Sequence, residues 1–240
     1  MRSTNRPQQF CATDLVQLFE GLAEDAGDIR CIILTGSGEK AFCAGGDLKE
    51  RDGMTTETWT EQHLIYERMI RAVVGCPIPL IAAVNGAAFG GGCELTGAAD
   101  FAYAAANARF ALTETSLGII PGAGGTQTIS RAVGERRAKE LIMSARRFTA
   151  EEALRWGLVN EVFELPDLLP EALKTAQKIA GNAPIAVRQA KKAIHGGLQL
   201  PLAEALEFEI EAYNVTVPTE DRIEGVRAFN EKRPAVFKGE

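Results

Sequence analysis

The sequence predicts an α/β protein with a parallel sheet in its first part and a helical second part. Short, continuously apolar segments alternate with amphipathic segments up to about residue 145, and helical patterns dominate the rest of the chain. Glycine-rich loops follow several of the apolar segments. Continuous apolar strands that alternate with helices are typical of parallel sheets covered on both faces. We therefore divide the chain into an α/β core, residues 1–145, and a helical region, residues 146–240.

Each element of the core follows from a local pattern. Residues 14–26 carry apolar side chains at helical spacing, and Thr13 precedes them as a candidate N-cap. A helix over 55–75 is expected to bury a face that includes Leu64 and Met69. In chain order we expect helix 14–26, strand 30–35, helix 55–75, strand 79–84, a helix that opens at Gly90–Gly92, and strand 100–105.

The second part of the chain shows helical periods with little strand character. We expect helices at roughly 126–143, 149–157, 167–181, 184–195, 202–216 and 219–231. No internal repeat or low-complexity tract interrupts them.

Charge and composition exclude several classes of protein. The net charge is −6, and residues 14–26 contain neither lysine nor arginine, so we expect no nucleic-acid partner. The apolar run 77–93 is interrupted by Pro79, Asn85 and glycines, so we expect no membrane span.

The cysteines and histidines argue against a metal centre. The five cysteines form no Cys-x-x-Cys pair, and the chain has only two histidines. Few side chains are therefore available as zinc ligands at the usual spacing. No secretory signal is visible. We expect reduced thiols, a cytoplasmic location and no bound metal.

The stretch GGGCE, which ends at Glu94, combines three glycines with a carboxyl group inside an apolar region. The first turn of a helix exposes unpaired N–H groups, and glycines let a ligand oxygen approach them closely. Three interpretations remain open here: a phosphate site, an oxyanion hole, or a tight strand-to-helix crossing that needs small residues. No Lys-Ser/Thr pair follows, which argues against a Walker-type loop.

A second carboxyl group and two more loops belong to the same pattern. Glu114 lies shortly before another glycine-rich helix start, Gly122–Gly125, and the loop AFCAGGD, residues 41–47, follows the first strand. Ligands bind at the carboxyl ends of parallel strands, so we expect these loops to share one site with Glu94.

These stretches together resemble the crotonase, or enoyl-CoA hydratase/isomerase, superfamily. The resemblance covers nearly the whole chain and is carried by GSGEKAFCAGGDLKE, IPLIAAVNGAAFGGGCEL, ARFALTETSLGIIPGAGGTQ, SARRFTAEEALRWGLVNEV and PTEDRIEGVRAFNEKRP. It implies a β/α spiral core, a helical C-terminal region for trimerisation and for covering coenzyme A, and a homotrimer or a dimer of trimers.

The resemblance also implies roles for particular residues. The two catalytic glutamates fall on Glu94 and Glu114, and the two oxyanion-hole N–H groups fall on Gly46 and Gly91. Arg51 is able to pair with an acyl chain that carries a second carboxylate. The residues implied in binding the substrate and coenzyme A are Ala44, Asp47, Leu48, Lys49, Gly122, Tyr213 and Lys232.

The N-terminal segment departs from the family pattern. Members usually carry a β-hairpin's worth of sequence before the segment that matches Asn5-Arg6-Pro7, where this sequence has four residues. Cys11 also stands where an asparagine is typical. We expect the sheet to lack its first strands and the coenzyme A site to be affected.

The resemblance implies an enoyl-CoA hydratase that adds water syn across the C2=C3 double bond of a 2-enoyl-CoA thioester, with no cofactor beyond the coenzyme A of the substrate. Glu114 is assigned as the acid that protonates C2 and Glu94 as the base that activates water. Three alternatives stay open: a methylglutaconyl-CoA hydratase, an enoyl-CoA isomerase, and a non-catalytic protein that binds coenzyme A thioesters.

Overall fold

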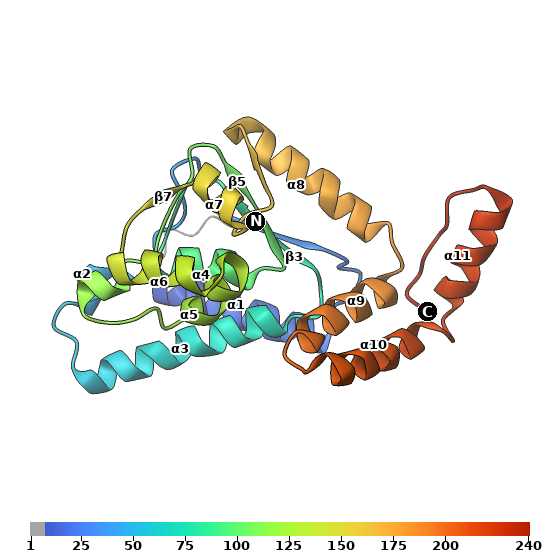
Figure 1. Cartoon of the computed structure of the whole chain (residues 1–240), viewed down its shortest axis with the longest axis horizontal. Coiled ribbons are helices and arrows are strands. Elements are labelled where there is room, and N and C mark those ends of the chain that lie inside the picture. Colours follow the sequence, from blue (N-terminus) through green and yellow to red (C-terminus); the bar gives the residue numbers. More distant parts are fainter. Residues whose placement is uncertain (1–7) are drawn as a thin grey trace. The chain divides into compact units, whose positions relative to one another are not determined.

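The computed structural model describes residues 8–240, which form two compact units. The first unit contains residues 33–76 and 80–173 together with the segment that ends at residue 25. The second contains 26–32, 77–79 and 174–240. In Figure 1 the segments of each unit can be found by their colours, which follow the residue numbers. The sequence-based division at residue 145 stays a prediction. The expected departure before Asn5 lies outside the described residues.

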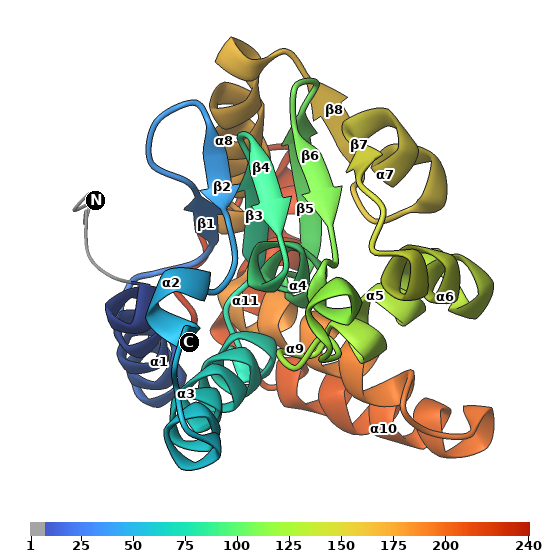
Figure 2. The same cartoon turned by 90° about the vertical axis from the view of Figure 1, so that its left-hand side faces the viewer.

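Two four-stranded sheets form the centre of the first unit (Figure 2). One has the order β1 (Ile32–Thr35), β3 (Leu80–Val84), β5 (Phe101–Ala105), β8 (Glu161–Phe163). The other has the order β2 (Ala41–Cys43), β4 (Ala87–Phe89), β6 (Arg109–Ala111), β7 (Phe148–Thr149). Strand β5 is parallel to β3 and β8, β4 is parallel to β2 and β6, and β7 is antiparallel to β6.

Strands β1, β3 and β5 of the first sheet confirm the three strands that the sequence predicts, within two residues at each end. The fourth strand of this sheet, β8, was not predicted. The second sheet was not predicted. Its strands have two or three residues each, which is too short for an alternating pattern to distinguish them from loops.

The helices of the first unit cover these sheets and lie at the strand ends. They are α1 (Gln8–Glu24), α2 (Leu48–Arg51), α3 (Thr56–Gly75), α4 (Gly91–Ala98), the 3₁₀ turn η1 (Glu114–Leu117), α5 (Gly125–Val133), α6 (Glu135–Ser144) and α7 (Ala150–Trp156). Helix α8 (Leu165–Ala180) runs from the first unit into the second. Helices α1 and α3 pack side by side, as Figures 1 and 2 show.

Three local predictions about the helices were wrong. Thr13 lies inside α1 and is not its N-cap. The helix expected over 126–143 is two helices, because Gly134 adopts φ 81°, a left-handed conformation that glycine tolerates at low cost. Leu64 is 57% exposed, whereas Met69 on the same helix is buried as expected.

The core of the first unit is built largely from the strands, which bury both small and large apolar side chains. All five residues of β3 are fully buried, which explains why its sequence is continuously apolar. Phe110 of β6 stacks on Phe148 of β7 with ring centroids 5.3 Å apart. Within residues 8–240, no helix combines the length and the apolar character needed to cross a membrane.

The second unit consists mainly of α9 (Pro184–Gly197), α10 (Leu202–Thr216) and α11 (Glu220–Glu231). Helices α9 and α10 pack closely, and a Cβ at Gly196 would stand 2.5 Å from the Phe208 ring. The buried carboxylate of Asp221 accepts hydrogen bonds from the N–H groups of Lys238 and Gly239, at 2.7 and 2.8 Å. These bonds attach the last residues of the chain to α11.

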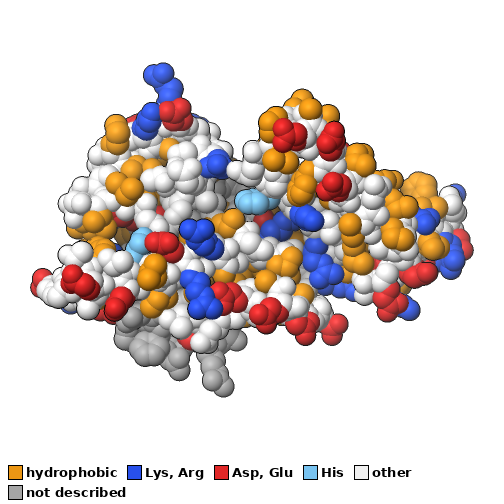
Figure 3. Space-filling model, turned by 90° about the horizontal axis from the view of Figure 1, so that it is seen from below, with side chains coloured by type: hydrophobic (Ala, Val, Ile, Leu, Met, Phe, Trp, Pro, Cys, Tyr) orange, Lys and Arg blue, Asp and Glu red, His pale blue; other side chains and the backbone are white. Residues whose placement is uncertain are grey.

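Large apolar side chains remain exposed on the helices of this unit. Figure 3 shows many hydrophobic side chains, in orange, on the face that it views. Those at least 50% exposed on α9–α11 and the adjoining loops are Ile194, Leu198, Leu202, Leu206, Ile210, Tyr213, Val226, Phe229 and Val236. Exposed apolar side chains in this number are typical of a region that contacts another protein chain.

Candidate active site

The junction between β4 and α4 brings backbone and carboxyl groups together. Gly90 adopts φ 51°, and α4 begins at the next residue, at the carboxyl end of β4 (Figure 2). A Cβ at Gly92 would stand 2.0 Å from the carbonyl oxygen of Cys43, and one at Gly90 would stand 2.8 Å from Oε1 of Glu114. The glycine run therefore serves the tight crossing and also leaves space for a carboxyl group.

Two backbone N–H groups near this junction have no hydrogen-bond acceptor within residues 8–240. In the described part of the chain, neither Gly46 N–H nor Gly91 N–H donates a hydrogen bond to another group. The loop that carries Gly46 lies against β4, since a Cβ at Gly45 would stand 2.7 Å from the carbonyl oxygen of Phe89. Gly46 and Gly91 line the same cavity. Two unused donors in one cavity are what an oxyanion hole requires.

Glu94 projects from the first turn of α4 and is 3% exposed. Its Oε1 accepts hydrogen bonds from the N–H groups of Ala123 and Gly125, at 2.8 and 2.9 Å. A Cβ at Gly125 would stand 2.8 Å from Cγ of Glu94, so this approach requires glycine. Burial raises the pKa of Glu94 to about 7, and the charge of Glu114 adds to the rise, while the two N–H groups oppose it.

Glu114 begins η1 and is 9% exposed. Among the described residues, its buried Oε2 has no hydrogen-bond partner. Burial raises the pKa of Glu114, and its own backbone N–H and the positive charge of Arg51 oppose the rise. A buried carboxyl oxygen without a partner is costly in a folded protein, so a functional role is the natural explanation.

The cavity has a volume of about 430 Å³. It combines the two carboxyl groups and the two glycines with a basic and aromatic wall from α2 and α3. Its lining residues are Gly46, Arg51, Trp59, Thr60, His63, Tyr66, Gly91, Glu94, Glu114, Ile119, Ile120, Gly122 and Ala123. Five predicted site residues, Gly46, Gly91, Glu94, Glu114 and Gly122, therefore meet in one place.

The other predicted site residues lie outside the cavity lining. Asp47 is the N-cap of α2, where its carboxylate accepts from Lys49 N–H at 2.9 Å. Ala44, Leu48 and Lys49 are exposed beside it. Tyr213 and Lys232 are exposed residues of the second unit. The binding roles of these residues stay predictions.

Trp59, His63 and Tyr66 of α3 also line the cavity, and sequence reasoning missed them. They are spaced four and three residues apart, so they share one face of a helix. That spacing of aromatic and imidazole groups is the signal that could have found them.

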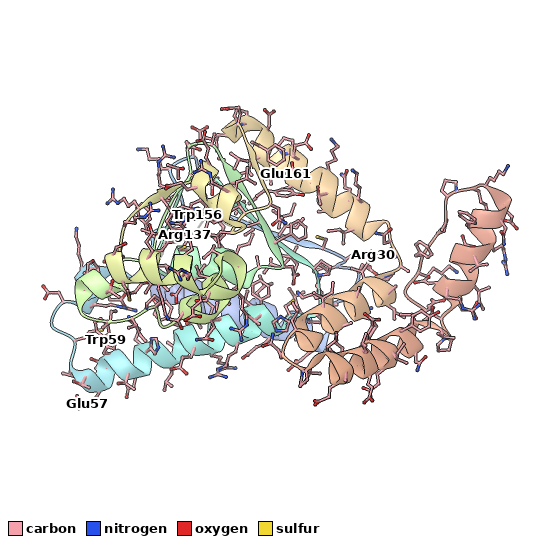
Figure 4. The ribbon with its side chains drawn as sticks, viewed as in Figure 1. Arg30, Glu57, Trp59, Arg137, Trp156 and Glu161 are labelled. Carbon is pink, nitrogen blue, oxygen red and sulfur yellow. The ribbon has the colours of Figure 1, made fainter. Side chains whose placement is uncertain are left out.

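A larger hollow of about 800 Å³ lies beside Trp156 at α6 and α7. The guanidinium of Arg137 lies 4.4 Å from the Trp156 ring centroid, and Figure 4 labels both residues. Arg137 forms a salt bridge with Glu140. The guanidinium of Arg146 also lies over the Trp156 ring, and it forms salt bridges with Glu140 and Glu152. Glutamates and arginines line this hollow, and the pair of buried carboxyl groups found in the smaller cavity has no counterpart among its lining residues.

The whole sequence matches one family profile. The family described as enoyl-CoA hydratase/isomerase matches residues 2–240. The chain belongs to this family. A crystal structure of enoyl-CoA hydratase from Bacillus anthracis is 48% identical, with a TM-score of 0.93 over 95% of this chain and 88% of that one. This agreement confirms the predicted α/β fold of the crotonase type.

Curated relatives have related names. The short-chain-enoyl-CoA hydratase of Clostridium acetobutylicum is 43% identical over 95% of this chain and 90% of its own length. The human mitochondrial methylglutaconyl-CoA hydratase is 42% identical over 88% of this chain and 64% of its own length. Both names describe hydration of an enoyl-CoA thioester.

Proposed function

We propose that the protein is a hydro-lyase that adds water across the C2=C3 double bond of a 2-enoyl-CoA thioester. One observation carries this proposal: two buried carboxyl groups and two unused backbone N–H groups line a single cavity. Family membership and the hydratases among the relatives support it.

The two N–H groups polarise the substrate. The thioester oxygen accepts from Gly46 and Gly91, which makes C3 electrophilic and stabilises the enolate-like charge that develops. Removal of one such donor in comparable sites costs about 3–4 kcal/mol of transition-state stabilisation. Because both donors are backbone groups held by packed glycine loops, they need little reorganisation during the reaction.

The two glutamates act as base and acid in the addition of one water molecule. Glu94 as carboxylate removes a proton from water, whose oxygen bonds to C3, and Glu114 as neutral acid delivers a proton to C2. A pKa of about 7 suits Glu94 for this role, because such a group is partly ionised at neutral pH and still basic. The unpartnered Oε2 of Glu114 supports its role as the donor to substrate. The product is the 3-hydroxyacyl-CoA.

The chemistry balances without redox change, so we propose that no cofactor takes part beyond the coenzyme A of the substrate. We propose a homotrimer or a dimer of trimers, supported by the exposed apolar side chains of α9–α11. Tyr213 and Lys232 are proposed to contact the nucleotide end of coenzyme A in such an assembly. We also propose a cytoplasmic location and no nucleic-acid or membrane partner.

The test is hydration of crotonyl-CoA, followed by loss of the conjugated thioester absorbance. We expect rapid loss with the natural protein and a decrease of at least about 10³-fold in kcat with either Glu94→Gln or Glu114→Gln. Glu61→Gln, an exposed glutamate on α3, is the matched control and should retain activity.

The same variants separate the alternatives. Strongly unequal effects of Glu94→Gln and Glu114→Gln would favour the isomerase, which needs one acid. Tight binding of crotonyl-CoA without turnover of this or any other enoyl-CoA would favour a non-catalytic protein and contradict the proposal.

A further inference from the structure

The loop that leads into α5 lies between two other helices of the first unit. Helix α4 contacts both α3 and α5 (Figures 1 and 2). Ala123 and Gly125 of the loop donate their N–H groups to Oε1 of Glu94 on α4, at 2.8 and 2.9 Å. The alternate residues, Gly122 and Gly124, lie against side chains of α3. The loop therefore connects α3 to the carboxyl group of Glu94.

Two side chains of α3 contact the loop. A Cβ at Gly122 would stand 2.4 Å from Cε1 and 3.0 Å from Nε2 of His63. The third nearest atom is Nδ1 of the same ring, at 3.5 Å, so no other group stands closer to this position. A Cβ at Gly124 would stand 3.3 Å from Cγ1 of Ile70, which lies two turns further along α3. One face of α3 therefore supports the loop at two points.

The imidazole of His63 is also contacted from its own helix. Its Nε2 lies 3.6 Å from Oε1 of Glu67, one turn further along α3. His63 lines the cavity together with Glu94 and Glu114. The ring therefore lies beside the loop that holds the proposed base, although the proposed proton transfers do not use it.

We propose that His63 is a positioning residue, whose ring keeps the loop 122–125 against α4 so that the N–H groups of Ala123 and Gly125 stay directed at Glu94. This inference rests on the proposed role of Glu94 as the base. It adds a residue on a different helix that controls this base without contact with the reacting atoms.

The two N–H groups affect how strongly Glu94 holds its proton. Burial raises the pKa of Glu94 to about 7, and the charge of Glu114 adds to the rise, whereas the N–H groups of Gly125 and Ala123 oppose it. If the loop moves away from Glu94, these donors are weakened and the pKa rises further. A hydrogen bond to a charged group is typically worth a factor of ten or more. We therefore expect Glu94 to become about a tenfold weaker acid in His63→Ala.

Other ionisable groups act on Glu94, and His63→Ala leaves their side chains unchanged. Glu114 and Cys93 interact with Glu94 through their charges, and Arg51 acts on Glu114 in the same way. Tyr66 lines the same cavity. A changed pH dependence therefore comes from Glu94 or from the loss of the imidazole's own titration, and the Glu94→Gln background separates these two sources.

The first measurement is kcat/KM for crotonyl-CoA as a function of pH, which reports ionisation in the free enzyme. A base of pKa about 7 that becomes a tenfold weaker acid loses about ninefold of its ionised form at pH 6 and almost none at pH 9. We therefore expect His63→Ala to lower kcat/KM about tenfold at pH 6 and less than about twofold at pH 9. His63→Phe keeps a planar ring beside Gly122 and should keep the profile of the natural protein.

A loss of kcat/KM that is equal at pH 6 and pH 9 would overturn the inference, because it would indicate that His63 contacts the substrate. A loss of the same size in His63→Phe and His63→Ala would overturn it too, since the packing of the ring would then have no effect.

Thermal unfolding tests the same inference without turnover. A folded-state pKa of Glu94 that rises above about 7 adds no loss of stability at pH 5, where the folded protein holds this proton in either case, and adds a loss at pH 8. The decrease in Tm caused by His63→Ala should therefore be about 2–4 °C larger at pH 8 than at pH 5. This difference should vanish in the Glu94→Gln background, because glutamine does not ionise.

Equal decreases at pH 5 and pH 8 would contradict the positioning role. A difference that persists in the Glu94→Gln background would contradict it as well, because it would come from the titration of His63. These outcomes decide the inference even if crotonyl-CoA is not hydrated, so its failure is distinguishable from the failure of the proposed function.

A double variant tests the contact itself. Gly122→Ala should lower Tm, because its Cβ would stand 2.4 Å from the ring of His63. His63→Ala should relieve this loss, so that the two substitutions together cost less than their sum. Additive losses would contradict the contact on which the inference depends. His195→Ala, at an exposed position near the end of α9, is the matched control and should leave the pH dependence of Tm and kcat/KM unchanged.

Discussion

Replacing Glu94 by glutamine should stabilise the protein at alkaline pH while it removes activity. Glu94 is 3% exposed, and its pKa rises from 4.5 to about 7 because burial disfavours the charged form. The amide oxygen of glutamine can accept the same two hydrogen bonds from Ala123 and Gly125. The variant therefore keeps the contacts of Oε1 and removes the ionisation.

The sign and size of the effect follow from proton linkage. Between pH 4.5 and about 7 the folded protein holds a proton on Glu94 that the unfolded chain has released, so stability falls as pH rises through this range. With these two pKa values, the raised pKa of Glu94 lowers the free energy of unfolding by about 3 kcal/mol at pH 8 and about 1 kcal/mol at pH 5. The gain from Glu94→Gln should thus be about 2 kcal/mol larger at pH 8 than at pH 5.

Thermal unfolding at the two pH values measures this difference. For a chain of this size about 2 kcal/mol corresponds to a Tm difference of about 4–8 °C. Glu61→Gln, on the surface of α3, controls for the loss of one negative charge and should show little dependence on pH. A Tm gain of Glu94→Gln that is the same at pH 5 and pH 8, or a loss that grows with pH, would refute the reasoning.

Two further variants test the glycine junction and a helix cap. Gly90→Ala should lower kcat/KM at least about tenfold and destabilise the fold by roughly 1–2 kcal/mol, because Gly90 has φ 51° and its added Cβ would stand 2.8 Å from Oε1 of Glu114. Gly134→Ala, with φ 81° and no atom within 4 Å of its added Cβ, is the matched control and should lose stability alone in the same assays. Thr149→Ala should lower Tm by about 2–4 °C without changing kcat, because it removes the capping box with Glu152 that starts α7, worth about 1 kcal/mol. An unchanged Tm would show that the cap contributes nothing to the folded state.

The local sequence pattern was sufficient to predict elements whose residues are all buried to a similar degree. Strand β3 is buried over its whole length, so its sequence is apolar throughout and its position could be predicted. Helix α3 begins within one residue of the start predicted from its helical spacing, with Thr55 as its N-cap. The strands of the second sheet could not, because pairing with distant strands defines them and each has at most three residues.

The sequence by itself determined the family, the fold class and the identity of the paired glutamates, because these depend on residue types at given positions. Only the tertiary structure decided what surrounds them. Glu94 takes its hydrogen bonds from residues 29 and 31 positions away, and Arg51 meets the face of α3 through Gln62. Burial and charge pairing are properties of segments that meet after the chain has folded, so the raised pKa of Glu94 and the exposure of the guanidinium to the cavity cannot be read from neighbours in sequence.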